Sequence, residues 1–546
     1  MKIALAQINY HIGNFAGNLD KAIKALENAK QHGADLIVFA ELAVSGYPPR
    51  DFLEFRDFIN RCYDSVQELA GHCRGIAAIV GAPGINPEDK GKDLLNSAYF
   101  LEDGEIKDVV HKTLLPNYDV FDEYRYFEPN REFRLIEYKG RKIALTICED
   151  LWNISNDPLY TINPMDELIK GRPDFMVNIA ASPFNYDQAP IRRDILLRNV
   201  KEYKIPLFYV NHVGAQTELL FDGGSMVINK NAQIVGELEF FQEDLQVFDL
   251  DRLNEMPAIT AEGKEQEKTA LIHDALVMGI RNYFEKLGFS KAILGLSGGI
   301  DSAVTLVLAV RALGKDNVRS VLMPSRFSSG HSVDDARKLA ENLGSPYDII
   351  SIAEPYESFL KTLDPQFHGL PFNLTEENLQ ARIRGVILMA ISNKFGYILL
   401  NTSNKSEAAV GYGTLYGDMN GGLSVLGDVY KTDVYELARY MNREEEIIPE
   451  STIVKPPSAE LRPGQKDSDS LPEYDILDKI LYQYIEKRKG PAEIIAMGFP
   501  EEVVKRTLKL VNTNEYKRHQ TPPILRVSTK AFGMGRRMPI VGKYLL

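Results

Sequence analysis

The stretch that decides the fold of the second half of the chain is Gly295-Leu296-Ser297-Gly298-Gly299-Ile300-Asp301-Ser302. It follows an apolar run at 292–294, which is typical of a buried strand, and it precedes residues 303–310, which are typical of a helix. Two adjacent glycines permit backbone angles that other residues resist, so consecutive N–H groups can converge on one anion. The N-terminus of the following helix adds partial positive charge. The stretch therefore predicts a phosphate site in a strand–loop–helix unit.

The polar residues of this stretch indicate ATP and a metal ion. Ser297 and Ser302 offer hydroxyls to phosphate oxygens, whereas Asp301 would repel phosphate and is better suited to holding Mg²⁺ against it. An ordinary Ser/Asp helix cap after a tight turn is the alternative interpretation. The strand–loop–helix context favours the nucleotide site, although no Gly-Lys-Ser/Thr follows as in a Walker A loop. We predict that residues 295–302 bind ATP.

Around this stretch, the pattern of apolar residues predicts regular alternation of helices and strands. Such alternation is typical of a doubly wound, Rossmann-like parallel sheet, so the fold class of the second half is α/β. The expected elements are a helix at 269–287, a strand at 291–296, a helix at 300–313, a strand at 318–323 and a helix at 331–343. Residues 458–471, rich in Ser, Asp, Pro and Gly, are predicted to form a mobile loop.

The first half combines short buried strands with hairpins. Asp103-Gly104 between two apolar runs is a strong hairpin signal, and Asn229-Lys230-Asn231 is similar. This mixture predicts an α/β sandwich with mixed sheets. A helix is expected at 20–31, and strands are expected at 3–8, 36–40, 76–80, 143–147, 175–180 and 207–210. A charged stretch separates the halves, so we predict one domain over 1–255, a linker over 256–268 and a second domain over 269–546.

Composition limits the classes of function. A chain of 546 residues exceeds what one core usually organises, and 44% hydrophobic with 25% charged residues is typical of globular protein. The net charge of −13 argues against nucleic acid as a partner. No apolar run reaches the roughly 18 residues of a membrane helix, so we expect no membrane partner. Three cysteines cannot form a disulfide framework, which favours a reducing compartment, the cytoplasm.

Three further motifs of the second half, read together with the glycine-rich loop, resemble those of the NAD synthetases, a family of pyrophosphate-loop ATPases. The resemblance covers nearly all of 269–523, and its motifs are Asn378-Leu379-Gln380-Ala381-Arg382, Thr402-Ser403-Asn404-Lys405-Ser406-Glu407 and Gly427-Asp428-Val429-Tyr430-Lys431. It implies that Thr402 and Lys431 bind ATP. It also implies that Asp301 and Glu407 hold Mg²⁺ and that deamido-NAD is bound by Asn378, Arg382, Glu407 and Lys517. Arg382 and Lys431, taken singly, could instead be ordinary helix residues.

The resemblance also implies a reaction. A carboxylate resists attack by ammonia, and transfer of AMP from ATP gives it a good leaving group. Ammonia then attacks the mixed anhydride and expels AMP. Bulk water at pH 7 keeps most ammonia protonated, so a second site that delivers it in a protected channel is useful.

In the first half, three reactive side chains follow predicted strands. Cys148 follows the strand at 143–147, Glu41 follows the strand at 36–40, and Lys112 follows the second strand of the Asp103-Gly104 hairpin. A cysteine at a strand end is often a small buried hydrophobe, and Glu and Lys there are often surface charges. A thiol, a base and a cation at three strand ends nevertheless form a plausible active site.

This set resembles the nitrilase-like carbon–nitrogen hydrolases over about 2–250, which implies an α/β/β/α sandwich. In that family Glu41 accepts the thiol proton, Cys148 attacks an amide, and Lys112 stabilises the oxyanion. Lys112 is also expected to favour thiolate over thiol. Glu123 fits either an auxiliary acid or a solvated loop charge. The predicted glutamine-binding residues are Tyr118, Ser182 and Gln188; because relatives often carry a basic residue at the last position, Arg192 or Arg193 could take its place.

A nitrilase-like glutaminase joined to such a synthetase resembles the glutamine-dependent NAD synthetases. That arrangement implies a ligase that uses glutamine, ATP and deamido-NAD and assembles as a homo-oligomer. A tRNA-modifying ATPase is the first alternative, and it would need a basic RNA surface, which the acidic balance does not favour. A first domain retained only for docking is the second alternative. The presence of Glu41, Lys112 and Cys148 argues against it.

Overall fold

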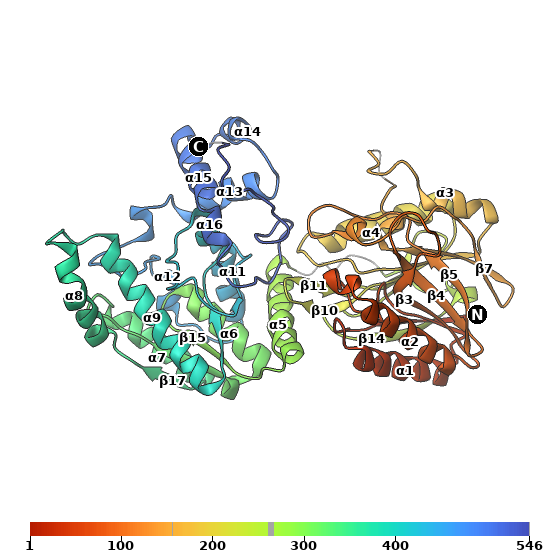
Figure 1. The fold of residues 1–546 in the computed structure, drawn as a ribbon, viewed down its shortest axis with the longest axis horizontal. Helices are drawn as coiled ribbons and strands as arrows, with labels where there is room; N and C mark the ends of the chain where they lie inside the picture. The colour runs from red at the N-terminus through yellow and green to blue at the C-terminus, as the bar shows by residue number, and fades with distance from the viewer. Residues whose placement is uncertain (155–156, 260–266, 545–546) are drawn as a thin grey trace. The chain divides into compact units, whose positions relative to one another are not determined.

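The structure, a computed structural model of the chain, describes residues 1–154, 157–259 and 267–544 (Figure 1). The chain divides into two compact units, Met1–Glu265 and Gln266–Leu546. Residues 260–266 of the predicted linker lie outside the described residues. Within the described ranges, no helix combines the length and apolar character needed to span a bilayer.

The first unit is built on two six-stranded mixed sheets. One has the strand order β14-β1-β2-β3-β4-β5 and the other β13-β12-β9-β8-β7-β6. The strands of the first sheet are β1 (Lys2–Gln7), β2 (Leu36–Val38), β3 (Ala77–Ile85), β4 (Leu94–Glu102), β5 (Glu105–His111) and β14 (Asp244–Asp249). Those of the second are β6 (Ile136–Tyr138), β7 (Arg141–Ile147), β8 (Phe175–Ile179), β9 (Leu207–Val210), β12 (Met226–Ile228) and β13 (Ile234–Glu237).

The two sheets of the first unit pack face to face, with helices outside. Strand β1 contacts β9, and β4 and β5 contact β7, so the inner faces share one hydrophobic core. Helices α1 and α2 pack against each other, and α2 covers the first sheet, whereas α3 contacts β7 of the second sheet (Figure 1). This confirms the α/β/β/α sandwich. The remaining elements of this unit are α1 (Phe15–Gln31), α2 (Arg56–His72), α3 (Pro164–Leu168), α4 (Gln188–Tyr203) and the hairpin of β10 (Val213–Gln216) and β11 (Leu219–Asp222).

Local sequence signals explain where these elements begin and turn. Asp103 and Gly104 have φ of 51° and 89°, and two positive φ angles match the twist of a two-residue hairpin between β4 and β5. Helix α1 begins earlier than the predicted residue 20 because the Asn14 side chain caps it, accepting a hydrogen bond from the Gly17 N–H.

The second unit contains one five-stranded parallel sheet with the order β17-β16-β15-β18-β19. Successive strands run outward from β15 in one direction to β17, and then from β18 in the other direction to β19. The strand order therefore reverses between β15 and β18, and such a switch point opens a ligand cleft at the carboxyl ends of the strands. The strands are β15 (Ala292–Gly295), β16 (Val318–Leu322), β17 (Tyr347–Ile349), β18 (Ile398–Asn401) and β19 (Leu423–Ser424).

Helices lie on both faces of this sheet, which confirms the doubly wound fold. Helices α5, α6 and α11 pack together, while α9 packs on β15 and β18 and also contacts α8. Helices α13, α14 and α15 contact one another in a C-terminal group, drawn in blue in Figure 1. The helices are α5 (Lys268–Leu287), α6 (Ile300–Leu313), α7 (Gly330–Leu343), α8 (Ala353–Phe367), α9 (Leu374–Phe395), α10 (Lys405–Val410), α11 (Lys431–Met441), α12 (Glu450–Val454), α13 (Tyr474–Ile485), α14 (Pro491–Ala496), α15 (Glu501–Thr513) and α16 (Glu515–Arg518).

Candidate active sites

The first unit buries an ion pair at the ends of two strands. Lys112 directly follows β5, and its Nζ donates a hydrogen bond of 2.7 Å to Oε1 of Glu41, which lies just beyond β2. Both side chains are fully buried. The second oxygen of Glu41 accepts the Ala181 N–H at 2.9 Å, and Asn96 Nδ2 donates to Oε1 at 2.7 Å. A buried charge needs such partners, so the structure holds Glu41 and Lys112 in one arrangement.

Glu123 completes this cluster. Lys112 Nζ donates to its two oxygens at 2.9 and 2.8 Å, and the Tyr47 hydroxyl donates to it at 3.0 Å. Burial raises the pKa of Glu123 to about 7, against the lowering effect of Lys112. The interpretation of Glu123 as a solvated loop charge is therefore wrong.

Cys148 begins the 3₁₀ turn Cys148–Leu151 directly after β7. Its φ of 43° lies in the left-handed region, which a residue with a side chain adopts only when its surroundings impose it. Burial, with the charge of Glu41, raises the pKa of the thiol well above its usual value, and Lys112 opposes this shift. Lys112 thus favours the thiolate, as expected, but burial and the neighbouring carboxylates outweigh its effect on the pKa.

Beside Cys148 lies a carboxylate that the sequence did not predict. Glu149 is buried, and it accepts hydrogen bonds from the Tyr118 hydroxyl at 2.9 and 3.0 Å and from the Tyr160 hydroxyl at 3.1 Å. Burial raises the pKa of Glu149, and Lys112 is the largest opposing influence. In the sequence, the one indication of a functional role for Glu149 is its position next to the candidate nucleophile.

The other two predicted glutamine-binding residues, Ser182 and Gln188, have different hydrogen-bond partners. Ser182 is buried next to Ala181, and its backbone N–H donates to Asn211 Oδ1 at 2.8 Å. Gln188 is the first residue of α4, and its Oε1 accepts from Asn185 Nδ2 at 3.1 Å.

The two arginines considered in place of Gln188 are bound to carboxylates. Arg192 is buried and donates to both oxygens of Asp222, at 3.0 and 2.7 Å. Arg193 donates to Glu237 at 2.7 Å. The suggestion that either arginine takes the place of a basic residue at position 188 is therefore not supported.

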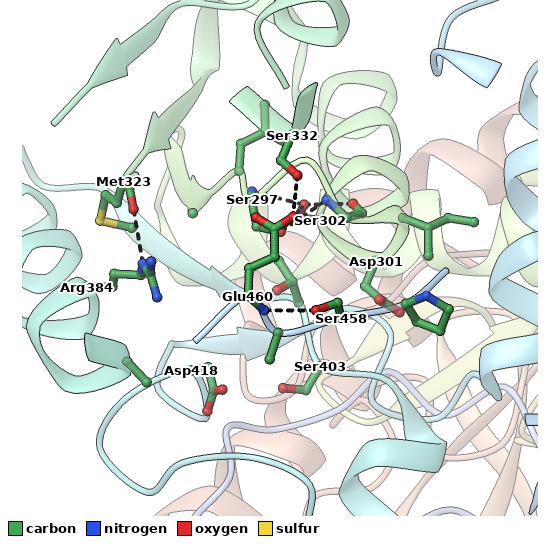
Figure 2. Close-up of a pocket in the computed structure, with 18 of the residues that line it drawn as sticks. Ser297, Asp301, Ser302, Met323, Ser332, Arg384, Ser403, Asp418, Ser458 and Glu460 are labelled. Carbon is green, nitrogen blue, oxygen red and sulfur yellow. Dashed lines mark hydrogen bonds between the residues drawn. The ribbon is translucent and has the colours of Figure 1, made fainter. Parts of the chain in front are cut away.

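In the second unit, the glycine-rich loop follows β15 at the switch point of the sheet and borders a cavity of ~280 Å³ (Figure 2). Hydrogen bonds within the loop shape it: the Ser297 and Ser302 hydroxyls lie 3.2 Å apart, and the Gly299 N–H donates to Ser297 Oγ at 3.2 Å. Ten of the predicted ATP and metal residues line the cavity: Gly295, Leu296, Ser297, Gly299, Ile300, Asp301, Ser302, Thr402, Glu407 and Lys431.

Gly298 does not line the cavity, but its conformation makes the loop possible. Its φ is +81°, and a Cβ at this position would lie 2.2 Å from the Ser332 carbonyl oxygen. Only glycine fits such a close approach of two backbones.

One cation and two carboxylates meet at the edge of this cavity. Lys431 Nζ donates to Asp301 and lies 3.5 Å from Glu407 Oε1, and Asn404 Nδ2 donates to Asp301 at 2.8 Å. Burial and the charge of Asp301 raise the pKa of Glu407 to about 8, although Lys431 lowers it. Two carboxylates beside a phosphate loop are hard oxygen donors of the kind that Mg²⁺ uses together with substrate phosphates. Among the described residues, no group of three or more His, Cys, Asp and Glu side chains forms a metal site without substrate.

The segment predicted to be a mobile loop, residues 458–471, contributes to the cavity wall. Ser458, Glu460 and Asp467 all line the cavity. Glu460 accepts hydrogen bonds from Ser332 Oγ and Lys455 Nζ, each at 2.7 Å, and Figure 2 shows it between Ser332 and Ser458. Lys455 and Glu460 were missed because a sequence rich in turn residues carries no signal of what it covers.

The three remaining deamido-NAD candidates do not line the cavity, and all three contact one segment, residues 411–415. Asn378 Oδ1 accepts from the Thr414 hydroxyl at 2.7 Å, and Arg382 Nε donates to the Leu415 carbonyl at 3.2 Å. Lys517 Nζ donates to the carbonyls of Gly411 and Gly413 at 2.7 and 2.8 Å. Residues far apart in the sequence thus converge on one loop.

Comparisons with known proteins place both units in described families. Residues 2–257 match the carbon–nitrogen hydrolase family model, and residues 272–521 match the NAD synthase model. The chain is 48% identical to the glutamine-dependent NAD(+) synthetase of Synechocystis sp., with 98% of each chain covered. It is 42% identical to the enzyme of the same name from Thermotoga maritima, covering 100% of this chain and 99% of that one.

Two solved structures match this chain along its whole length. The glutamine-dependent NAD+ synthetase of Acinetobacter baumannii, solved in complex with ADP, is 42% identical and gives a TM-score of 0.78, with 100% of this chain and 99% of that chain covered. The structure from Cytophaga hutchinsonii, at 21% identity and a TM-score of 0.84 over 100% of this chain and 98% of that one, shows the same fold.

Proposed function

We propose a division of labour for this chain, which belongs to the glutamine-dependent NAD(+) synthetases. Residues 1–255 hydrolyse glutamine to glutamate and ammonia, and residues 269–546 use ATP and that ammonia to convert deamido-NAD to NAD, with release of AMP and pyrophosphate. The observation that carries this proposal is the buried Lys112–Glu41 pair of 2.7 Å beside Cys148, in the same chain as a phosphate loop at the switch point of a parallel sheet.

In the glutaminase unit, Glu41 accepts the proton of the Cys148 thiol as the sulfur attacks the amide carbon. The raised pKa of the thiol keeps the proton in place until substrate arrives, so proton transfer and attack are coupled. Lys112 stabilises the oxyanion. Ammonia departs with the proton from Glu41. Glu41 then accepts a proton from a water molecule as the water oxygen attacks the thioester carbon; the C–S bond breaks, and Glu41 returns the proton to the Cys148 sulfur as glutamate is released.

The glutamine pocket recognises its substrate partly through a negative charge. The Glu149 carboxylate, held by Tyr118 and Tyr160, receives the α-ammonium group of glutamine, because a buried carboxylate gains most from a cationic partner. Ser182 and Gln188 supply neutral polar contacts to the same end of the substrate.

In the synthetase unit, the loop 295–302 binds the ATP phosphates through its backbone N–H groups and the Ser297 and Ser302 hydroxyls, with Thr402 at the end of β18. Lys431 adds positive charge to these phosphates. Asn378, Arg382 and Lys517 hold deamido-NAD with its carboxylate toward the α-phosphorus. The carboxylate attacks that phosphorus and pyrophosphate leaves; ammonia then attacks the acyl carbon and AMP leaves.

Asp301 and Glu407 would hold Mg²⁺ against the ATP phosphates, and the ion would neutralise charge on the departing pyrophosphate. The carboxylates fit this role because both already bracket a cation, Lys431. The chain functions in the cytoplasm as a homo-oligomer. Its low cysteine count, three in 546 residues, supports the reducing compartment in this proposal.

The test separates the two units by their nitrogen source. Cys148→Ala is expected to lose NAD formation from glutamine and to keep NAD formation from ammonium salt, whereas Asp301→Ala loses both. Cys73→Ala, which changes another buried cysteine of the same unit, is the matched control and keeps both activities. Normal use of glutamine by Cys148→Ala would refute the assignment of the first unit.

A further inference from the structure

We propose that Asp150 is a positioning residue that fixes the Cys148 thiol relative to the Lys112 ammonium. The proposal rests on the proposed function, in which Cys148 is the nucleophile and Lys112 stabilises the oxyanion. Asp150 is the third residue of the turn that Cys148 begins, and its side chain is buried. It touches neither of those side chains through a described hydrogen bond, so its effect on them passes through the backbone.

The Asp150 carboxylate joins the two strand ends that carry the catalytic pair. Its Oδ1 accepts the N–H groups of Thr113 and Leu114 at 3.0 and 2.8 Å. Its Oδ2 accepts the N–H of Ile147 at 3.0 Å. Thr113 and Leu114 directly follow Lys112, and Ile147 directly precedes Cys148. One side chain therefore sets the separation of two segments that are more than thirty residues apart in the sequence.

For Cys148, the bond to Ile147 restrains a strained backbone. A cysteine at φ 43° persists only where the neighbouring structure over-determines it. Asp150 restrains the chain on the amino side of the turn, and Asn178 Nδ2 donates to the Cys148 carbonyl at 3.4 Å. Release of the Ile147 bond would let the turn relax and move the sulfur.

For Lys112, Asp150 supplies the restraint on the carboxyl side. The Lys112 N–H donates to the Asn96 carbonyl at 2.8 Å, which continues the pairing of β4 and β5 by one residue. Beyond it the chain leaves the sheet, and the next two N–H groups bind Asp150. Because Glu41 and Glu123 hold the ammonium itself, the Lys112 side chain is fixed at both ends.

All the hydrogen bonds described for Asp150 come from backbone N–H groups, which assigns it a geometric task and not a share in proton transfer. Its neighbour Glu149 is bound instead by two tyrosine hydroxyls. A misplacement of about 1 Å at reacting atoms can cost roughly 100-fold in rate. We therefore expect loss of Asp150 to lower kcat and to leave glutamine binding largely intact.

The experiment measures glutaminase kcat and KM for Asp150→Asn and Asp150→Glu, expressed per folded enzyme, with the folded fraction determined from the thermal unfolding transition of each variant. Asn removes one acceptor oxygen at nearly constant shape, and Glu keeps the charge but displaces the oxygens. Both variants are expected to lose ~100-fold in kcat, to change KM by less than about threefold, and to alkylate Cys148 more slowly. Asp174→Asn is the matched control, because Asp174 accepts the Lys142 N–H at 2.7 Å at the opposite end of β7.

Each result supports or overturns the inference. Should Asp150→Asn fail to fold, Asp150→Glu, which keeps a carboxylate, is sufficient for the test. A kcat per folded enzyme within about threefold of wild type in a folded Asp150 variant overturns the inference, as does an equal loss in Asp174→Asn. Cys148→Ala, measured alongside, separates the two proposals: its activity with glutamine would overturn the proposed function itself.

Discussion

Two lysines that carry the proposed chemistry are each buried among carboxylates. Lys112 is bound by Glu41 and Glu123, and Lys431 by Asp301 and Glu407. Removing one member of a buried ion pair leaves an uncompensated charge, which typically costs about 3–5 kcal/mol. Both sites thus hold their charges in place before substrate binds, at the cost of shifted pKa values.

The pKa of Glu407 gives a prediction about stability. Its folded-state value of about 8 exceeds the ordinary 4.5, so between these values the folded enzyme holds a proton that the unfolded chain releases. The free energy of unfolding therefore falls as pH rises through this window. Glu407→Gln removes that titration. The melting temperature of the variant minus that of the wild type should therefore rise from pH 5 to pH 9.

The melting temperatures of the free enzymes at pH 5, 7 and 9 provide the check. Glu501→Gln is the control, because Glu501 is exposed and its pKa is lowered by Lys505. A difference between Glu407→Gln and wild type that stays constant with pH would contradict the raised pKa.

Residue types at strand ends indicated Glu41, Lys112 and Cys148 as a candidate set, and the resemblance to the nitrilase-like carbon–nitrogen hydrolases supplied their expected roles. The roles of Glu149 and Asp150 were not predictable. Both are acidic residues directly after Cys148, yet one binds two tyrosine hydroxyls and the other binds three backbone N–H groups. Only the three-dimensional positions of Tyr160, Thr113 and Leu114 distinguish them.

At the scale of elements, the phosphate loop depends on the close approach of helix α7. Gly298→Ala places a Cβ where the Ser332 carbonyl already lies, at a φ that disfavours a side chain. We expect it to lower NAD formation from ammonium by ~100-fold, because the loop N–H groups lose their alignment on the phosphates. Glutaminase activity should remain.

Gly330→Ala is the matched control for this prediction. Gly330 begins α7, and a Cβ there meets no atom within 4 Å. Steady-state rates with ammonium and with glutamine alone compare the two variants. Equal activities of Gly298→Ala and Gly330→Ala would show that the loop tolerates a side chain.

Elements with strong periodicity were predicted well, and irregular segments were not. Helix α6 has the predicted bounds, and α5 and α7 differ from theirs by one residue, because long apolar faces and glycine stops mark them. Residues 458–471 were expected to be a mobile loop, yet they line the cavity. Their contacts with Ser332 and Lys455 are tertiary, so local composition could not predict them.

At the scale of the whole molecule, each unit has its own sheets and its own cluster of buried charged side chains. The two chemistries have incompatible needs: one site must bury a thiol among carboxylates, and the other must surround phosphates with N–H groups and cations. Division into two units meets both needs in one chain. The sequence was sufficient for this conclusion, since each half carries its own set of motifs.

The central claim is that the nitrogen released in the first unit becomes the carboxamide nitrogen made in the second. The most direct measurement supplies the enzyme with ATP, deamido-NAD and glutamine labelled with ¹⁵N at the amide, and then determines the mass of the NAD formed. The account predicts that the NAD carries the label and that Cys148→Ala forms none from the same mixture. Unlabelled NAD from the wild-type enzyme, or labelled NAD from the cysteine variant, would contradict it.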